Sequence, residues 1–191
     1  MHLIILGPHG AGKGTQSYEI SKYYSLPRIS TGDIIRENIQ KGTELGKKAK
    51  RYIDDYKYVP DEIINTAIEE IIDNDPLYKK GFVLDGYPRT IQQTGFFDAF
   101  LMKINVALDV IIHLQVNEDE LVKRLIKRGK EQKRTDDTAE GIRSRMNEYV
   151  TKAAPVVEHY RAGGKLVDIN GDQEVDKVFK DIKQVLDKFV K

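Results

Sequence analysis

A glycine-rich segment near the N-terminus constrains the fold of this chain more than any other feature. Residues 7–15 read Gly-Pro-His-Gly-Ala-Gly-Lys-Gly-Thr, follow the apolar run Leu3–Leu6 and precede a helix-like pattern. A strand, a glycine-rich loop and a helix in this order are typical of a phosphate-binding loop. Glycines let the backbone turn with positive φ and bring its N–H groups near phosphate oxygens, and the helix end adds a positive dipole. The segment predicts a nucleotide site in which Lys13 contacts the terminal phosphates.

Two positions in this loop, the one directly after Lys13 and His9, each allow a further prediction. Gly14 directly follows Lys13, and the hydroxyl side chain comes one residue later, at Thr15. A direct bond from a hydroxyl to Mg²⁺ is therefore not expected. His9 is expected to be an exposed loop residue. The alternative for the whole segment is an ordinary glycine-rich turn between a strand and a helix.

Length and composition narrow the class of protein. The 191 residues fit one α/β domain, and 31 basic and 30 acidic side chains nearly cancel, so no overall field favours nucleic acid or a membrane. The absence of cysteine excludes disulfides and thiolate zinc sites. The N-terminal apolar run is too short for a signal-peptide core, and no later run approaches a membrane span. We expect a cytoplasmic protein with no nucleic-acid or membrane partner.

Short apolar runs alternate with helical patterns along the chain. This alternation predicts a doubly wound α/β fold whose parallel strands are buried by helices on both faces. Ligands of such sheets lie at the carboxyl ends of the strands, where the glycine-rich loop and Asp85 would emerge. The order of the strands is left undetermined. The five runs are residues 3–6, 26–29, 82–84, 110–114 and 166–169.

A long helical region without a convincing strand lies between Thr31 and Ile72, with breaks near Gly42 and Pro60. It is longer than a simple crossover needs. We interpret it as a semi-independent helical flap over the edge of the sheet. An ordinary pair of crossover helices is the alternative.

The one strongly charged segment is Lys123–Arg134, with seven basic residues against one acid. It continues a helix expected to begin at about Glu118. A solvated basic helix end is the alternative to a functional role. The sequence Thr135-Asp136-Asp137 then predicts the cap of a further helix that carries Arg143 and Arg145.

These pieces suit phosphoryl transfer, which needs positioning and neutralisation of charge more than covalent chemistry. Asp85 ends an apolar strand and could hold Mg²⁺ through water, with a turn or cap residue as the alternative. No Ser-His-Asp or Cys-His arrangement supplies a general base, and an anionic phosphate acceptor needs none. The sequence therefore predicts a phosphate acceptor. The candidate arginines are Arg36, Arg89, Arg124, Arg134 and Arg145.

Four motifs make the chain resemble the adenylate kinases of the P-loop nucleoside monophosphate kinase family over essentially its whole length. They are Gly10–Thr15, Ser30-Thr31-Gly32-Asp33 with Arg36, Asp85-Gly86-Tyr87-Pro88-Arg89-Thr90 with Gln93, and Arg134–Asp137 with Arg145. The resemblance implies one domain, residues 1–191, with a five-stranded parallel sheet. Its core would comprise residues 1–30, 61–123 and 137–191, with a monophosphate-binding flap at 31–60 and a short lid at 124–136. The lid lacks the zinc insert of some relatives, and His9 replaces the usual Pro.

The resemblance also implies ATP and AMP as substrates, Mg²⁺ as cofactor and a role for each matching residue. The catalytic residues would be Lys13, Arg89, Arg124, Arg134 and Arg145. ATP would contact Gly10, Ala11, Gly12, Lys13, Gly14, Thr15, Arg124, Arg128 and Gly171. AMP would contact Thr31, Gly32, Arg36, Val59, Ile64, Gly86, Arg89, Gln93, Arg134 and Arg145. Asp85 would hold Mg²⁺ through water.

Gln93 favours adenylate as acceptor, because its amide can both donate to and accept from the edge of adenine. Relatives that use uridylate or cytidylate usually carry Asn at this position, and a UMP/CMP kinase is the nearest alternative. A nucleotide-binding switch without transfer is a further alternative, but the chain lacks the guanine-reading Asn-Lys-x-Asp pattern. A nucleic-acid-binding patch at residues 123–134 is another, but this segment lacks interleaved aromatics for base stacking. A monomer is expected, although the family includes oligomers.

Overall fold

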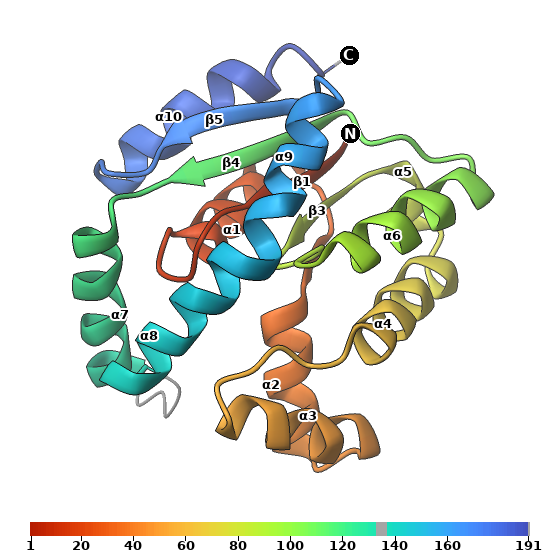
Figure 1. Ribbon diagram of the computed structural model, residues 1–191. Helices are drawn as coiled ribbons and strands as arrows, with labels where there is room; N and C mark the ends of the chain where they lie inside the picture. The colour runs from red at the N-terminus through yellow and green to blue at the C-terminus, as the bar shows by residue number, and fades with distance from the viewer. Residues whose placement is uncertain (133–136, 191) are drawn as a thin grey trace.

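The computed structural model describes residues 1–132 and 137–190. Figure 1 shows a central sheet with helices packed on both of its faces. In chain order the elements are β1 (His2–Leu6), α1 (Lys13–Tyr24), β2 (Arg28–Ser30), α2 (Thr31–Lys41), α3 (Glu44–Asp54), α4 (Asp61–Asn74), α5 (Leu77–Lys80), β3 (Phe82–Asp85), α6 (Ile91–Lys103), β4 (Val110–Gln115), α7 (Glu118–Gln132), α8 (Ala139–Glu148), the π-helical turn η1 (Tyr149–Ala153), α9 (Ala154–Ala162), β5 (Leu166–Asn170) and α10 (Val175–Leu186).

The sheet has five parallel strands in the order β2-β3-β1-β4-β5 among the described residues, which confirms the predicted fold class. β1 is central: Ile4 lies opposite Leu84 of β3 on one side and Ile111 of β4 on the other. The last residue of β2, Ser30, lies opposite Asp85 at the end of β3. The glycine-rich loop after β1 and the acidic end of β3 therefore emerge at one edge of the sheet.

Successive residues of the strands are buried on opposite faces, because side chains alternate along a strand. On one face Ile4 belongs to a cluster with side chains of α4, α6 and α9, such as Phe97. On the other face Leu3 and Ile5 pack with side chains of α1, α7 and α10, such as Ile182. Both faces are thus apolar and covered, as an all-parallel sheet requires.

Helices α2 and α3 form a hairpin that lies below the sheet in Figure 1. The predicted break at Gly42 is confirmed: this residue ends α2 with φ 64°, a left-handed conformation that favours glycine. Gly46 of α3 lets the two helices touch, since a Cβ there would lie 2.1 Å from the carbonyl oxygen of Asn38. Ala49 and Val59 belong to the same core cluster as Ile4, so the hairpin is joined to the body by apolar packing. Its status as a separate flap stays a prediction.

The region of the predicted lid differs from expectation at its end. Helix α7 runs unbroken through the expected boundary between residues 123 and 124. Helix α8 is capped by Thr138, whose hydroxyl accepts from the N–H of Gly141. The predicted cap at Thr135–Asp137 is therefore wrong: the Asp137 carboxylate binds arginines instead of a helix end, and residues 135 and 136 lie outside the described residues.

A helix that crosses a bilayer must be both long and apolar. None of the described helices meets both requirements.

Candidate active site

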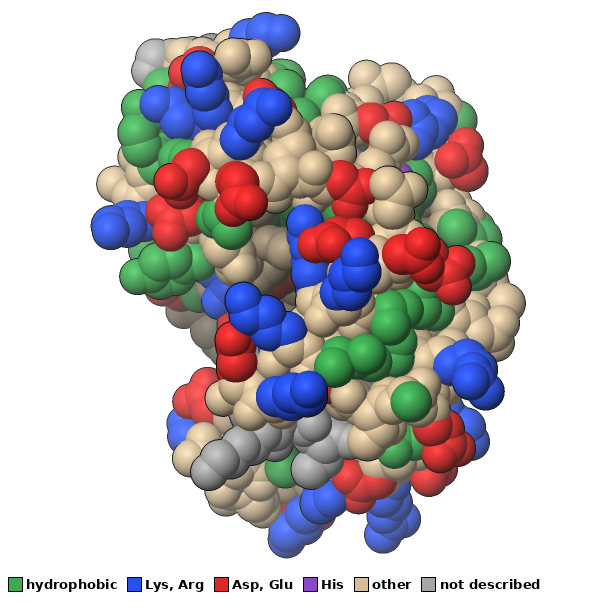
Figure 2. Space-filling model, turned by 90° about the vertical axis from the view of Figure 1, so that its left-hand side faces the viewer, with side chains coloured by type: hydrophobic (Ala, Val, Ile, Leu, Met, Phe, Trp, Pro, Cys, Tyr) green, Lys and Arg blue, Asp and Glu red, His purple; other side chains and the backbone are tan. Residues whose placement is uncertain are grey.

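A cavity of about 1060 Å³ opens at the carboxyl ends of the strands. Figure 2 shows this side of the molecule hollowed, with Lys and Arg side chains around the hollow. Every predicted site residue within the described residues lines the cavity, and Arg134 lies outside them. Those brought together are Gly10, Ala11, Gly12, Lys13, Gly14, Thr15, Thr31, Gly32, Arg36, Val59, Ile64, Asp85, Gly86, Arg89, Gln93, Arg124, Arg128, Arg145 and Gly171.

The glycine-rich loop packs closely against its neighbours and leaves its far end open. A Cβ on Gly7 would lie 2.8 Å from the carbonyl oxygen of Leu114 in β4, so this position admits only glycine. Gly12 precedes α1 with φ 91°, and a Cβ added there would have no described atom within 4 Å. The N-terminus of α1 is therefore accessible to an anion from the cavity.

Lys13, the first residue of α1, points back into the loop. Its Nζ donates to the carbonyl oxygens of Gly7 (2.7 Å) and Pro8 (2.8 Å). Burial lowers the pKa of Lys13 to about 7; the charge of Asp85 opposes this shift and that of Arg89 adds to it. The ammonium group is thus poorly stabilised by the protein alone, and phosphate oxygens would favour its charged form.

His9 is half-buried in the cavity and is not the exposed loop residue that we expected. Its ring centroid lies 6.2 Å from that of Tyr58. Burial lowers the pKa of His9 well below its ordinary value, and the charges of Arg89 and Lys13 lower it further. The imidazole is therefore neutral in this arrangement. The expectation failed because the fold brings Tyr58, 49 positions away, beside the imidazole, and the loop sequence does not reveal this contact.

Two arginines from separate helices meet at one buried carboxylate. Arg128 of α7 donates from Nε (2.7 Å) and Nη2 (2.9 Å) to Asp137, and Arg145 of α8 binds the same carboxylate. The Asp137 side chain is 0% exposed. Its burial would raise its pKa, but the hydrogen bonds from Arg128 and Arg145 lower it below the ordinary value. Sequence reasoning placed Asp137 in a helix cap and in the motif Arg134–Asp137, but it did not predict that this carboxylate binds Arg128 and Arg145.

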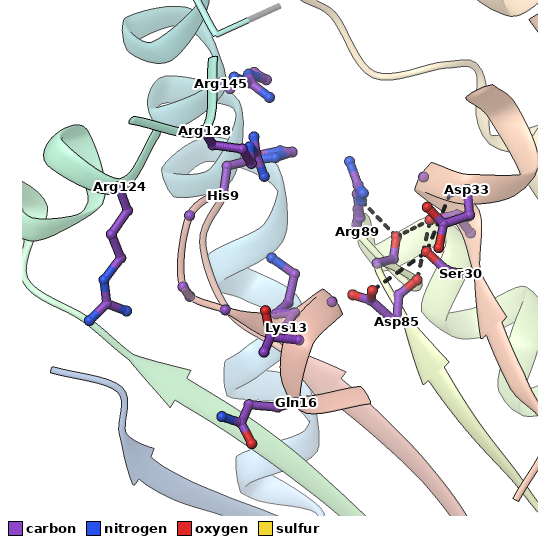
Figure 3. A pocket seen from close by; sticks show the side chains of 18 of the residues that line it. His9, Lys13, Gln16, Ser30, Asp33, Asp85, Arg89, Arg124, Arg128 and Arg145 are labelled. Carbon is purple, nitrogen blue, oxygen red and sulfur yellow. Dashed lines mark hydrogen bonds between the residues drawn. The ribbon is translucent and has the colours of Figure 1, made fainter. Parts of the chain in front are cut away.

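Arg124 does not join this pair in the structure. Figure 3 shows it directed away from Arg128 and Arg145. Its Nε donates to Glu120, one turn earlier on α7, over 2.8 Å. The sequence correctly placed Arg124 and Arg128 on one helix, but the two side chains have different partners.

The opposite wall of the cavity carries the other predicted arginines. Arg89 donates from Nε to the carbonyl oxygen of Gly86 (2.6 Å), and its guanidinium lies 5.2 Å from the ring centroid of Tyr58. Thr31 donates to the same carbonyl oxygen over 2.8 Å. Arg36 pairs with Asp33 on α2. Tyr58 was not predicted as a site residue, because an isolated tyrosine carries no pattern that marks it.

Gln93 is buried, and both ends of its amide are engaged. Its Oε1 accepts from the backbone N–H of Arg89 and its Nε2 donates to Asp61, each over 2.7 Å. The hydroxyl of Thr90 also binds Asp61, over 2.6 Å. The amide is therefore held in one orientation at the wall of the cavity, with its donor and its acceptor both defined.

Known proteins resemble this chain over almost its whole length. The sequence model described as "Adenylate kinase" matches residues 5–165 of the chain. The chain belongs to the adenylate kinase family. A relative from Nocardioides sp. is 44% identical over 98% of this chain and 97% of its own length. Relatives from Mycobacterium sp. (45%; 97% and 99%) and Archaeoglobus fulgidus (39%; 98% and 99%) are also named adenylate kinase. The function of the chain is that of an adenylate kinase, a nucleoside monophosphate kinase.

Adenylate kinases act on Mg-ATP, and the surroundings of Asp85 fit such an ion. Asp85 Oδ2 accepts from Arg28 (3.2 Å) and, over 3.5 Å each, from the hydroxyls of Ser17 and Ser30. Asp85 lines the cavity, and no hydrogen bond from the described part of the chain occupies its Oδ1. Carboxylate oxygens are ligands that Mg²⁺ prefers, often through water. The described residues hold no group of three or more His, Cys, Asp or Glu placed to bind a metal directly.

Proposed function

We propose that this adenylate kinase transfers the terminal phosphoryl group of ATP to AMP reversibly, giving two ADP, with Mg²⁺ as cofactor. One observation carries the proposal: a single cavity is lined both by the loop Gly10–Thr15 and by Arg36, Arg89 and Gln93. Donor and acceptor phosphates bound at these two walls would face each other across one enclosed space. Holding two reactants in this way removes much of the entropic barrier to their reaction.

The donor side is built around the loop and the lid-side helices α7 and α8. Backbone N–H groups of residues 10–15 would bind the phosphates of ATP. Lys13 would exchange its two carbonyl partners for phosphate oxygens, which would raise its pKa. Arg124, Arg128 and Gly171 would contact the rest of the nucleotide. All of these residues line the cavity, which supports the assignment.

Transfer itself would depend on neutralising charge. Arg89, Arg124, Arg134 and Arg145, with Lys13, would surround the transferred phosphoryl group, whose charge spreads over its oxygens. No general base is needed, since the acceptor oxygen belongs to a phosphate. Asp85 would hold Mg²⁺ through water, and the ion would shield the phosphate charges.

The acceptor side would bind AMP at the wall formed by β2, β3 and the α2–α3 hairpin. Arg36 and Arg89 would clamp its phosphate. Thr31, Gly32 and Gly86 would line the path to the base, and Val59 and Ile64 would pack against the base itself. Gln93 would read the adenine edge, with the adenine taking the place of Asp61 on the Nε2 side. The backbone N–H of Arg89, which donates to Oε1 of Gln93, would keep the amide in this orientation, and this contact supports the assignment.

We further propose that the flap (31–60) and the lid (124–136) close over the substrates and exclude water as a competing acceptor. A contact of the flap with the start of the helix that follows the lid supports this: Thr138, the N-cap of α8, donates to the hydroxyl of Tyr56 over 3.1 Å. We expect a monomer in the cytoplasm, without a structural zinc ion, since the chain has no cysteine.

Phosphorus NMR of the purified protein with Mg-ATP and, in turn, AMP, UMP, CMP and GMP tests the proposal. ADP formed from AMP alone is the expected result, and Lys13→Ala controls for a contaminating kinase. Turnover of UMP or CMP equal to that of AMP would remove Gln93 as the base reader. Omission of Mg²⁺ should abolish transfer, and Asp85→Asn should raise the Mg²⁺ concentration needed for half-maximal rate.

A further inference from the structure

Arg28, the first residue of β2, lies between two acidic residues at the floor of the cavity. Its Nη1 donates to Asp33 Oδ2 (2.6 Å) and its Nη2 to Asp85 Oδ2 (3.2 Å). Its Nε donates to the hydroxyl of Ser17 over 2.8 Å, and that hydroxyl lies 3.5 Å from Asp85 Oδ2. The Arg28 side chain is only 23% exposed. No pattern in the sequence singled it out.

The charges of this group balance within the protein. Asp33 also binds Arg36, so two carboxylates are matched by two guanidinium groups. Figure 3 shows Asp33, Ser30 and Asp85 gathered on one side of the cavity, facing Lys13. The acidic pair is therefore not an unbalanced cluster that awaits a cation: its counter-charge is already built in.

A divalent cation that approaches Asp85 from the cavity meets a guanidinium fixed on the same carboxylate. The two positive charges repel each other, and the carboxylate is partly neutralised before the ion arrives. A bound nucleotide would change the local charge around Asp85. Its phosphates would bring several negative charges to the neighbouring loop and would supply oxygen ligands for the cation. Binding of the cation near Asp85 would then be favourable only in the nucleotide complex.

We propose that Arg28 is a built-in counter-ion for Asp33 and Asp85 and makes occupation of this acidic pair by a divalent cation conditional on a bound nucleotide. The proposal rests on the role proposed above for Asp85. Arg28 is in this sense a positioning residue, since it acts through the two carboxylates. A purely structural role, as a link between β2, α1 and β3, is the alternative that the experiment must separate.

The probe is Mn²⁺, whose free form is measured by electron paramagnetic resonance while it is titrated into the intact protein. Without nucleotide, the wild-type protein should retain little Mn²⁺, and Arg28→Gln should bind it about tenfold more tightly, because one nearby positive charge is removed. Arg51→Gln, which removes an exposed arginine of α3, is the matched control and should behave as wild type. With ATP present, all three proteins should bind Mn²⁺ with similar affinity.

Arg28→Lys separates charge from structure. It keeps the positive charge and loses the three-way hydrogen bonding, so the nucleotide-free protein should still exclude Mn²⁺, even where its thermal stability falls. Equal Mn²⁺ affinity of wild type and Arg28→Gln without nucleotide would overturn the proposal, as would Arg28→Lys behaving like Arg28→Gln.

Asp85→Asn keeps the proposal testable if Arg28→Gln does not fold. Without nucleotide this variant should match the wild type, since Arg28 already offsets the charge of the carboxylate; loss of Mn²⁺ binding relative to wild type there would contradict the counter-ion role. With ATP it should bind Mn²⁺ more weakly than wild type. No difference in the ATP complex would reject the role of Asp85 itself, a failure distinct from that of Arg28.

Discussion

The cations on the two sides of the cavity are held in opposite ways. On the lid side, Arg128 and Arg145 share Asp137, whose side chain is 0% exposed. On the acceptor side, Arg36 pairs with Asp33, whose side chain is 49% exposed, and the Arg89 guanidinium contacts a carbonyl oxygen and an aromatic ring. Removing one partner of a buried ion pair strongly destabilises a protein, because the remaining charge is left buried without a counter-charge. An exposed ion pair contributes little to stability. The lid-side cations are therefore positioned by one buried carboxylate, whereas on the acceptor side an exposed carboxylate holds Arg36, and backbone and ring hold Arg89.

The largest effect is expected from Asp137→Asn. The change leaves Arg128 and Arg145 near each other without their shared counter-charge, at a cost of about 3 kcal/mol in the free energy of unfolding. Misplacement of Arg145 should lower kcat about 100-fold. Chemical denaturation and steady-state assays measure the two quantities. Asp33→Asn is the control on the exposed side, and its stability should change by less than about 1 kcal/mol; equal losses in both variants would remove the contrast.

The stability difference between the wild type and Asp137→Asn should depend on pH. The direction of this dependence follows from the lowered pKa of Asp137. A carboxyl with a lowered folded-state pKa stabilises the protein fully above its unfolded pKa of about 4 and loses this contribution as pH falls through the folded value. The stability gap between wild type and Asp137→Asn should therefore be constant from pH 7 to about pH 5 and shrink below about pH 4. A gap of unchanged size from pH 5 down to pH 3 would show that the loss is not electrostatic.

Lys13 differs from the arginines of the lid side, because no carboxylate holds it: among the described residues its hydrogen bonds go to carbonyl oxygens alone. Burial lowers its pKa to about 7, and bound phosphates should raise it again. Binding of ATP should thus take up a proton, and the Kd for ATP should rise by up to about tenfold per pH unit between pH 7.5 and 9. Calorimetry in two buffers of different ionisation enthalpy measures the uptake. Lys13→Met should lose most of it; an unchanged uptake would assign the proton to another group.

Tyr58→Leu tests the ring that faces Arg89. Loss of a cation–π contact is expected to cost about 1 kcal/mol, seen as a roughly fivefold rise in the KM for AMP with kcat nearly unchanged. Tyr58→Phe keeps the ring and should match the wild type. If the phenylalanine variant is as impaired as the leucine variant, the hydroxyl and not the ring positions Arg89.

The smallest effect is expected from Glu120→Gln on the lid side. This partly exposed pair, one turn apart on α7, should contribute no more than about 0.5 kcal/mol to stability. The KM for ATP should change by less than twofold, since Arg124 is not held by Asp137. A tenfold loss of kcat would show that Glu120 orients Arg124 for the reaction and that lid-side positioning extends beyond the buried carboxylate.

Local patterns along the chain were enough to predict most elements and the chemistry that follows from them. Apolar runs and helical periods located the five strands, and the loop from Gly7 to Thr15 indicated a phosphate site before any fold was known. Four motifs in order identified the family. Such features are readable because backbone conformation and side-chain periodicity are set by near neighbours in the chain.

Contacts between residues far apart in the chain could not be predicted in this way and follow from the folded arrangement. The pairing of β2 with β3 brings Arg28 to Asp85, 57 positions away, and packing of the chain after α3 brings Tyr58 to Arg89. Asp137 looked like a cap and became the shared partner of two arginines, because it packs against Gly129 of α7, where an added Cβ would lie 3.0 Å from the Cβ of Asp137. Contacts of this kind depend on strand order and helix packing, which leave no periodic trace in the sequence. The same physical reason explains why His9 was expected outside and lies within.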